Sequence, residues 1–223
     1  MKAGRNHGKN QPSAVSQAEE KEKKSETHRA GQTPIGLAVP DEKQPILLHA
    51  CCAPCATHVI ELLSRSYSVT ALFYNPNIQP DDEYQRRLQA MRQLCQHTGT
   101  RLLVESSPVS VWDSWVQGLE DEPEQGRRCL RCFTGRLEYC VSTADRLGFP
   151  WVATTLTVSP RKPAGAINAI GVSVAANAHT CYLESDFKKQ DGFKRSCELS
   201  KSYNLFRQNY CGCLYSLRDR DAL

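Results

Sequence analysis

Short apolar runs alternate with longer segments of helical character along most of the chain. The runs are rich in β-forming residues, are typical of buried strands, and cover residues 45–49, 68–74, 101–105, 149–157 and 181–183. Between them lie segments typical of helices, over residues 56–65, 81–95, 109–119, 133–147 and 164–177. Strands that alternate with helices predict an α/β fold, with a mostly parallel sheet and helices on both of its faces.

The two ends of the chain depart from this alternation. Residues 1–44 contain few apolar side chains and many mixed charges, so they cannot bury enough surface to offset the entropy of ordering. We therefore expect a disordered tail over residues 1–44 and a single α/β domain over residues 45–223. After the last strand, we expect a basic loop with interleaved aromatic residues over 186–196, and then a polar helix through Tyr203 to Gln208. A cysteine-containing C-terminal segment follows.

Composition narrows the class of protein. A chain of 223 residues with 40% hydrophobic residues can bury one sizeable core, and its net charge of +4 does not by itself predict nucleic-acid binding. It has 11 cysteines, an odd count, but no secretory signal and no apolar run long enough to span a membrane. We therefore expect a reducing, cytoplasmic location, where clustered cysteines favour metal binding or redox chemistry over structural disulfides.

Three cysteines follow the first predicted strand directly. Cys51, Cys52 and Cys55 lie in a turn that leads from this strand into a helix. The carboxyl end of such a strand is where α/β proteins bind ligands. Adjacent cysteines are unusual for structural zinc, whose ligands are normally separated by two to four residues. The spacing therefore favours an iron–sulfur cluster, or two neighbouring metal sites.

A CxxC pair, Cys129 and Cys132, lies in the middle of the chain. It follows an acidic stretch, is surrounded by arginines and precedes a helix expected over residues 133–147. A thiol at a helix N-terminus near positive charge is biased toward the thiolate, the form that binds metal. The pair is thus a second candidate source of metal ligands.

A CxC pair, Cys211 and Cys213, lies near the C-terminus of the sequence. A disulfide across a single intervening residue closes a small ring, so it is strained and easily reduced. Such a pair can store two electrons and release them to a neighbour. The four remaining cysteines are isolated and are expected to behave as small buried hydrophobic residues: Cys95, Cys140, Cys181 and Cys197.

Six ordered motifs occur along the chain. They are LLHACCAPC at 47–55, FYNPNI at 73–78 with Glu83, Tyr84 and Arg87 behind it, EDEPE at 120–124 with RCLRCF at 128–133, TTLTVSP at 154–160, DFKK at 186–189 and RQNYCGC at 207–213. Together they resemble those of the cobalamin-independent epoxyqueuosine reductases of the QueH type, over about residues 45 to 216. The segment after Ser159-Pro160, Arg161-Lys162-Pro163, lacks the Lys-Asp pair expected in this family. The resemblance implies a Rossmann-like (HUP-like) fold.

The resemblance also implies an activity and a set of site residues. The reaction would be reduction of epoxyqueuosine to queuosine at the wobble position of tRNAs for Asp, Asn, His and Tyr, the last step of queuosine biosynthesis. An external donor would supply the electrons. Carried over by motif, the ligands of a [4Fe–4S] cluster would be Cys51, Cys52, Cys129 and Cys132, with Cys55 as an alternative ligand, and the redox-active pair would be Cys211 and Cys213. An additional mononuclear iron would suit the family.

Epoxide reduction also needs a proton donor and an RNA-binding surface. Asp186 and Tyr84 are candidate acids, and Asp186 is also a candidate carboxylate ligand for the second iron. A basic set that could follow the tRNA backbone, with Phe187 and Phe193 available for base stacking, consists of Lys188, Lys189, Lys194 and Arg195.

Two other functions fit part of the sequence. One is an ATP-pyrophosphatase-like tRNA-modifying enzyme, which would need a Gly- and Ser-rich phosphate loop after the first strand, where this chain has cysteines. The other is a zinc-binding RNA-interaction module without redox activity. Neither the electron donor nor the oligomeric state follows from the sequence.

Overall fold

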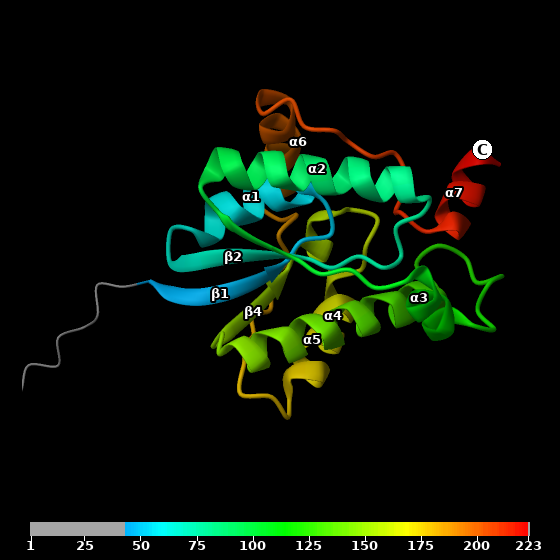
Figure 1. The fold of residues 1–223 in the computed structure, drawn as a ribbon, viewed down its shortest axis with the longest axis horizontal. Coiled ribbons are helices and arrows are strands. Elements are labelled where there is room, and N and C mark those ends of the chain that lie inside the picture. Colours follow the sequence, from blue (N-terminus) through cyan, green and yellow to red (C-terminus); the bar gives the residue numbers. More distant parts are fainter. Residues whose placement is uncertain (1–42, 223) are drawn as a thin grey trace, which may run out of the picture. The chain divides into compact units, whose positions relative to one another are not determined.

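The computed structural model describes residues 43–222, and its centre is a five-stranded sheet (Figure 1). The strands are β1 (Gln44–His49), β2 (Tyr67–Phe73), β3 (Arg101–Val104), β4 (Trp151–Thr154) and β5 (Cys181–Tyr182). They lie in the order β3-β2-β1-β4-β5, and every pair is parallel. This confirms the α/β class with a parallel sheet. Residues 1–42 of the predicted tail lie outside the described residues, and the last residue assigned to the tail, Gln44, is the first residue of β1.

Helices cover both faces of the sheet. The long ones are α1 (Ala53–Leu63), α2 (Asp81–Thr98), α4 (Arg127–Leu147), α5 (Ala164–Ala175) and α6 (Gly192–Ser202), and the short ones are α3 (Val109–Val116), α7 (Leu214–Asp221) and the 3-10 helix η1 (Thr155–Val158). Figure 1 shows α1 and α2 on one face, with α6 packed on α1, and α4 and α5 on the other. The prediction of helices on both faces is confirmed.

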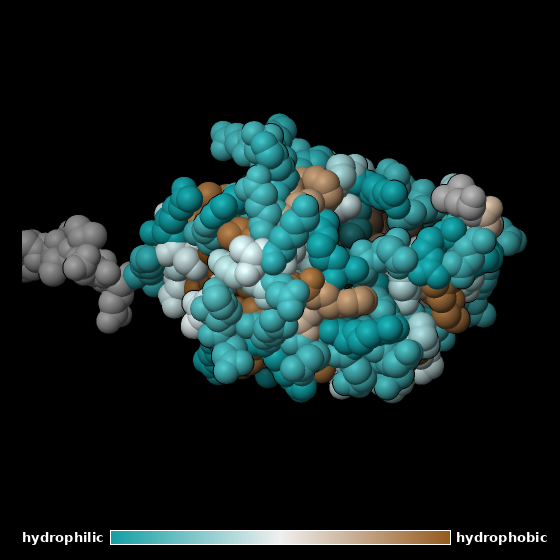
Figure 2. All heavy atoms as spheres, turned by 90° about the horizontal axis from the view of Figure 1, so that it is seen from above, coloured by the Kyte–Doolittle hydropathy of each residue, from teal (hydrophilic) through white to brown (hydrophobic). Residues whose placement is uncertain are grey.

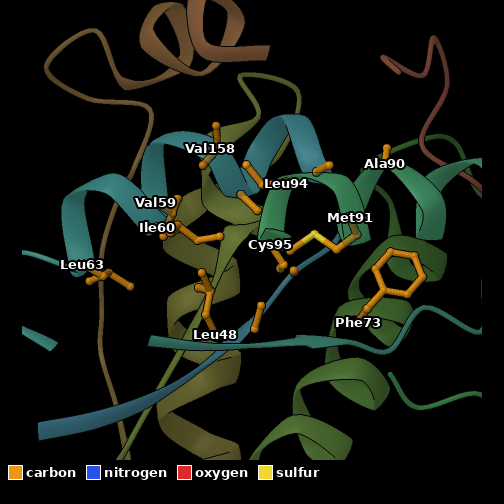
Figure 3. Close-up of a cluster of buried hydrophobic side chains, with 14 of the residues drawn as sticks. Leu48, Val59, Ile60, Leu63, Phe73, Ala90, Met91, Leu94, Cys95 and Val158 are labelled. Carbon is orange, nitrogen blue, oxygen red and sulfur yellow. The ribbon is translucent and has the colours of Figure 1, made fainter. Parts of the chain in front are cut away.

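Side-chain alternation along the strands produces two cores. Ile46 and Leu48 of β1 point toward α1 and α2, where they pack with residues such as Val59 and Met91 (Figure 3). Leu47, between them in the sequence, packs on the opposite face against residues of α4 and α5. All three β1 leucine and isoleucine side chains are fully buried. A strand buried on both faces explains why this segment has a continuous apolar run rather than an alternating pattern.

The strand order places a crevice beside the first cysteines. The chain leaves β1 and β4 toward opposite sides of the sheet, so the carboxyl ends of these neighbouring strands form a topological switch point, the usual ligand position in open α/β sheets. Cys51 follows β1 there and Thr155 follows β4. The fold therefore brings two segments about a hundred residues apart to the same edge.

Several predicted boundaries were wrong. Helix α4 begins at Arg127 rather than 133, so the CxxC pair lies within its first two turns. The strand expected over 149–157 ends at Thr154, because the next residues form η1. The basic stretch at 192–196 is the start of α6 rather than a loop, and α6 ends at Ser202, so 203–208 is not helical. A positive φ of 49° at Asn204 is incompatible with continuing that helix.

Close packing of α5 against the sheet edge gives a testable prediction. A Cβ atom on Gly171 would lie 2.3 Å from the Tyr182 ring, whereas one on Gly165, in the first turn of the same helix, would meet no atom within 4 Å. We expect Gly171→Ala to lower the free energy of unfolding by about 1–3 kcal/mol through overpacking. The control Gly165→Ala should leave it unchanged or raise it by up to about 1 kcal/mol. Equal denaturation midpoints for the two variants would contradict this packing.

The surface is polar on the face that carries α2 and α6. Figure 2 looks down on this face, and hydrophilic residues predominate over small, separate apolar patches. Among the described helices, none is both long and apolar enough to cross a bilayer.

Candidate metal and redox site

Three cysteine sulfurs meet at the switch point. The Sγ atoms of Cys51, Cys52 and Cys55 all lie within 4.8 Å of one another, and those of Cys51 and Cys52 are 3.8 Å apart. Cys52 is the N-cap of α1 and Cys55 lies in its first turn, which Pro54 helps to start. Cys51 and Cys52 are buried. We call these three residues the cysteine triad; it is a suitable donor set for a metal because three thiols converge from one rigid turn.

Three hydrogen bonds fix the triad from distant segments. The Thr155 hydroxyl accepts from the Cys51 backbone N–H at 2.9 Å and donates to the Cys51 sulfur at 3.2 Å. The Gln208 side-chain amide donates to the Cys52 sulfur at 2.8 Å. Donors directed at sulfur stabilise a thiolate or a metal-bound sulfur and orient it. Neither Thr155 nor Gln208 was assigned this role from the sequence, although Thr155 follows a strand end at the switch point.

The triad concentrates negative charge on one sulfur. Hydrogen bonds from the Cys52 and Cys55 thiols lower the pKa of Cys51 well below its usual value, and the Lys162 and Arg136 charges act in the same direction. The same interaction with Cys51 raises the pKa of Cys52 to about 11 and raises that of Cys55. A thiolate among neighbouring thiols and cations is the state that binds a metal ion most readily.

A cavity of about 650 Å³ opens above the triad. All three triad cysteines line it, together with Cys211 and the polar residues Asn77 and Gln208. The side-chain oxygens of Asn77 and Gln208 are buried and have no hydrogen-bond partner among the described residues. The volume falls within the range of small-molecule pockets and would admit a nucleoside.

The structure places the other predicted ligands in a second group. Cys129 and Cys132 line a hollow of about 20 Å³ with Cys211 and Cys213, beside the buried Trp112. Their sulfurs do not join the triad within 4.8 Å. Burial raises the pKa of Cys132 and raises that of Cys129 to about 12, so the thiolate bias expected from the helix N-terminus was wrong. Desolvation of a buried thiolate exceeds the stabilisation by the helix dipole here.

Cys211 lies at the junction of the two groups. It is the one cysteine that lines both the cavity above the triad and the hollow beside Cys129 and Cys132. Both Cys211 and Cys213 are free thiols in the structure. Cys211 of the C-terminal CxC pair therefore lies between two sets of thiols that the family resemblance assigns to one cluster.

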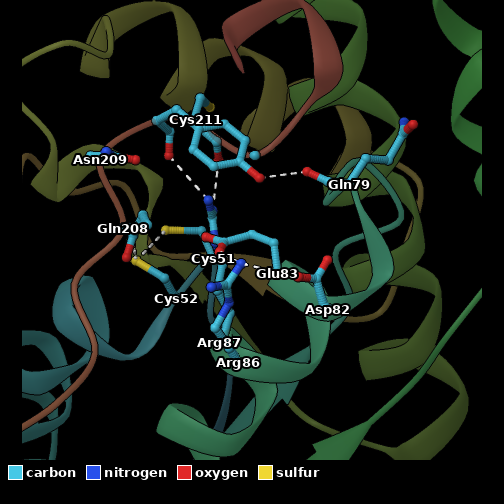
Figure 4. A network of polar contacts seen from close by, with 12 residues as sticks. Cys51, Cys52, Gln79, Asp82, Glu83, Arg86, Arg87, Gln208, Asn209 and Cys211 are labelled. Atoms are coloured by element: carbon cyan, nitrogen blue, oxygen red, sulfur yellow. Dashed lines mark hydrogen bonds and ion pairs between the residues drawn. The ribbon is translucent and has the colours of Figure 1, made fainter. Parts of the chain in front are cut away.

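A buried ion pair holds Cys211 in this place. Glu83 and Arg87, one turn apart on α2, are 4% and 2% exposed, and Arg87 Nε donates to Glu83 at 2.8 Å. Arg87 also donates to the backbone carbonyls of Cys211 at 2.9 Å and Tyr210 at 3.2 Å, as Figure 4 shows. Since the guanidinium fork is rigid, the two carbonyls are fixed relative to α2.

Further contacts fix the segment around Cys211 on both sides. The Gly212 carbonyl accepts from the Gln79 backbone N–H at 2.8 Å, and the Tyr210 hydroxyl donates to the Gln79 carbonyl. Gly212 has φ of 137°, and a Cβ there would lie 3.0 Å from Asn77 and 3.1 Å from Arg87. Glycine is required because the backbone conformation and the close approach both exclude a side chain.

The predicted acids and the predicted RNA-binding cations lie outside the cavity lining. The Asp186 carboxylate forms an ion pair with Lys188 at 2.8 Å, and Arg195 forms one with Glu61 at 2.6 Å. Tyr84 packs against Phe73, and burial raises its pKa, which weakens it as an acid. None of the predicted acids and none of the predicted RNA-binding cations lines the cavity: Asp186, Tyr84, Lys188, Lys189, Lys194 and Arg195.

The two predicted stacking residues differ in exposure. Phe187 is 5% exposed and belongs to the core, so it cannot stack on a base. Phe193 is 38% exposed and lines the cavity. Of the two phenylalanines, only Phe193 is placed to contact a ligand in the cavity.

The fold and the site together define an α/β protein whose switch point carries a cysteine triad in place of a glycine-rich phosphate loop. The family model described as "Epoxyqueuosine reductase QueH" matches residues 46–219. The chain belongs to the QueH epoxyqueuosine reductase family, and is an oxidoreductase. The family resemblance inferred from the motifs is confirmed.

Curated members of the family cover most of the chain. A protein named epoxyqueuosine reductase QueH from Streptococcus pyogenes serotype M1 is 42% identical over 179 residues, which are 78% of this chain and 70% of that protein. The one from Haemophilus influenzae is 36% identical over 82% of this chain and 76% of its own length. The one from Thermotoga maritima is 33% identical over 78% of this chain and 91% of its own length.

A solved structure shares the fold at low sequence identity. It is the U34-tRNA thiolase NcsA from Methanococcus maripaludis with its [4Fe-4S] cluster, with a TM-score of 0.52 and 11% identity. The match covers 81% of this chain and 64% of that one. This likeness supports the fold class alone.

Proposed function

We propose that this protein reduces epoxyqueuosine to queuosine in tRNA, at the wobble position of tRNAs for Asp, Asn, His and Tyr. The observation that carries the proposal is one cavity whose wall combines the cysteine triad with Cys211 of the CxC pair. A metal-binding group and a two-electron dithiol at one cavity suit a two-electron reduction. The identity of the substrate is inferred from family membership. After each turnover, an external electron donor would reduce the disulfide of the CxC pair again.

The triad fits an iron–sulfur cluster in the chemistry of its donors. Thiolates are the usual cluster ligands, and the buried turn supplies three of them, each within reach of the others. The structural neighbour from M. maripaludis, which carries a [4Fe-4S] cluster, has the same fold class. A cluster bound here would transfer single electrons and polarise an oxygen atom. Two ligand sets are consistent with the proposal: Cys51, Cys52, Cys129 and Cys132, or the triad, which includes Cys55, and one further ligand.

The two sets leave different roles for Cys55. If Cys129 and Cys132 complete the cluster, Cys55 is left facing the cavity and is available to an additional mononuclear iron. Asp186 remains our proposed carboxylate for such an iron, and would have to leave its pair with Lys188 to reach it. Thr155 and Gln208 would in either case hold the sulfurs of Cys51 and Cys52 in place.

The reaction balances with the dithiol as reductant. Removing the epoxide oxygen as water forms a C=C bond and consumes two electrons and two protons. Oxidation of the Cys211 and Cys213 thiols to a disulfide releases two electrons and two protons. The sum is epoxide plus dithiol giving alkene, disulfide and water. The cavity-lining Arg136 guanidinium, which is buried, would stabilise negative charge as the epoxide oxygen leaves.

Metal content after anaerobic purification tests the proposal. We expect iron and inorganic sulfide in about equal amounts, with a broad visible absorption band. Cys55→Ala and Cys129→Ala separate the two ligand sets, because only the variant that removes a cluster ligand loses most of the band. Cys181→Ala, an exposed cysteine of β5, is the matched control. Stoichiometric zinc without a visible band would instead support a zinc-binding RNA module and refute the reductase.

A further inference from the structure

Positive charge surrounds the cavity. Its lining includes two acidic side chains, Glu124 and Asp219, and six cationic ones: Arg87, Arg136, Arg161, Lys162, Arg207 and Arg220. Arg87 is paired with Glu83, and Arg220 with Asp221 at 2.5 Å. The other four form no ion pair with a described residue. Repulsion between neighbouring like charges destabilises the folded state, so such a cluster indicates an anionic ligand.

The unpaired cations are arranged by depth. Arg136 is 2% exposed, and its Nε has no hydrogen-bond partner among the described residues although it is fully buried. Lys162 is half-buried, and Arg161 and Arg207 are exposed. Positive charge thus continues from the rim of the cavity toward the triad. The exposed cations suit a ligand that keeps its charged groups at the mouth, whereas the buried Arg136 faces the group that enters the cavity.

The segments that carry the rim cations are tied to the triad. Arg161 and Lys162 follow η1, whose first residue, Thr155, is hydrogen-bonded to Cys51. Arg207 precedes Gln208, which is hydrogen-bonded to Cys52 (Figure 4). The rim charges are therefore held at fixed positions relative to the reactive sulfurs.

We propose that Arg161, Lys162 and Arg207 bind the phosphates on either side of the target nucleotide, so that its base enters the cavity while the RNA backbone stays at the rim. We call these three residues the phosphate rim. The inference rests on the proposed function, because it assumes an RNA substrate. It moves the RNA contacts from Lys188, Lys189, Lys194 and Arg195, which lie outside the cavity lining, to the cavity mouth.

Salt-dependent RNA binding tests the phosphate rim. The probe is an unmodified RNA hairpin with the anticodon loop of tRNA for aspartate, and the protein is the anaerobically purified full chain. The test variant is Arg161→Gln/Lys162→Gln/Arg207→Gln, and the matched control is Lys188→Gln/Lys189→Gln/Lys194→Gln, which removes the same number of charges. A plot of log K for RNA binding against log salt concentration has a negative slope, and loss of three phosphate contacts should make this slope shallower by about 2.

A slope change of about 2 means that the rim variant binds the hairpin on the order of 100-fold more weakly than the wild-type protein at 0.1 M salt, with little difference near 1 M salt. The control should change the affinity by less than about threefold, since its charges lie outside the cavity. A charge-keeping variant, Arg161→Lys/Arg207→Lys, should retain most of the binding. Equal weakening by the two triple variants, an unchanged slope for the rim variant, or failure of the lysine variant to bind would overturn the inference.

The same measurement separates this inference from the proposed function. The hairpin contains no epoxyqueuosine, so its binding does not depend on reduction. A protein that lacks iron and does not reduce epoxyqueuosine would refute the proposed function, yet the difference between the two triple variants would still decide on the phosphate rim.

Discussion

Replacing Cys211 with serine should abolish reduction of epoxyqueuosine-containing tRNA, by at least about 10³-fold, because the dithiol can no longer form a disulfide. The iron content and visible spectrum should stay at the wild-type level, since in the proposed partition Cys211 is an electron store and not a cluster ligand. Single-turnover rates and iron assays on the same anaerobic preparation measure both quantities. Cys213→Ser should behave in the same way.

A control and an opposing result make this prediction sharp. Cys181→Ser changes an exposed cysteine of β5 outside the cavity lining and should leave both turnover and iron unchanged. Loss of iron from Cys211→Ser would show instead that this thiol is a ligand. Cys211 lies in the wall shared by the cavity and the smaller hollow. Loss of iron would therefore contradict its proposed role as an electron store that is not a cluster ligand.

Replacing Arg87 with methionine should destabilise the protein by about 3 kcal/mol, because the buried Glu83 carboxylate keeps only its ion pair with the exposed Arg86, at 3.2 Å. The carbonyls of Tyr210 and Cys211 would also lose their donors. Denaturant unfolding measures the first effect. The alkylation rate of Cys211 in the still-folded protein measures how far the CxC segment is released.

The neighbouring helix surface provides the comparison for Arg87. Arg92→Met removes an exposed arginine from the same helix and should change stability by no more than about 0.5 kcal/mol. Adding Glu83→Leu to Arg87→Met removes the buried carboxylate that has lost its buried partner, and should restore part of the lost stability. If Arg87→Met unfolds at the same denaturant concentration as Arg92→Met, the buried ion pair does not fix this segment.

Local patterns predicted the fold well because each strand and helix is determined by nearby residues. The apolar run at 45–49 identified β1, since a strand buried on both faces needs no polar alternation. The predicted boundaries of helices and strands were less accurate where tertiary contacts determine them. Arg128 lies in the first turn of α4 because its side chain is buried and donates to the carbonyls of Glu120 and Glu122, a contact that no helix-start signal indicates.

The site was only partly predictable for a related reason. Spacing separated the cysteines into three groups and placed one of them correctly at a strand end, but spacing does not say which groups meet. The position of Cys211 depends on Arg87, 124 residues earlier in the chain. An i, i+4 pair of Glu83 and Arg87 on a helix usually indicates a solvent-exposed salt bridge, so its burial could not be inferred from the sequence alone.

The hydrogen bond from Gln208 to Cys52 joins residues 156 positions apart, and it has a consequence for biosynthesis. On the ribosome, the turn that carries the triad and the strands that support it are made long before this residue. Until residues 208–211 emerge, the triad is open on the side that they later cover. The Cys52 sulfur therefore receives this hydrogen bond only after the CxC segment has been made and has docked beside the triad.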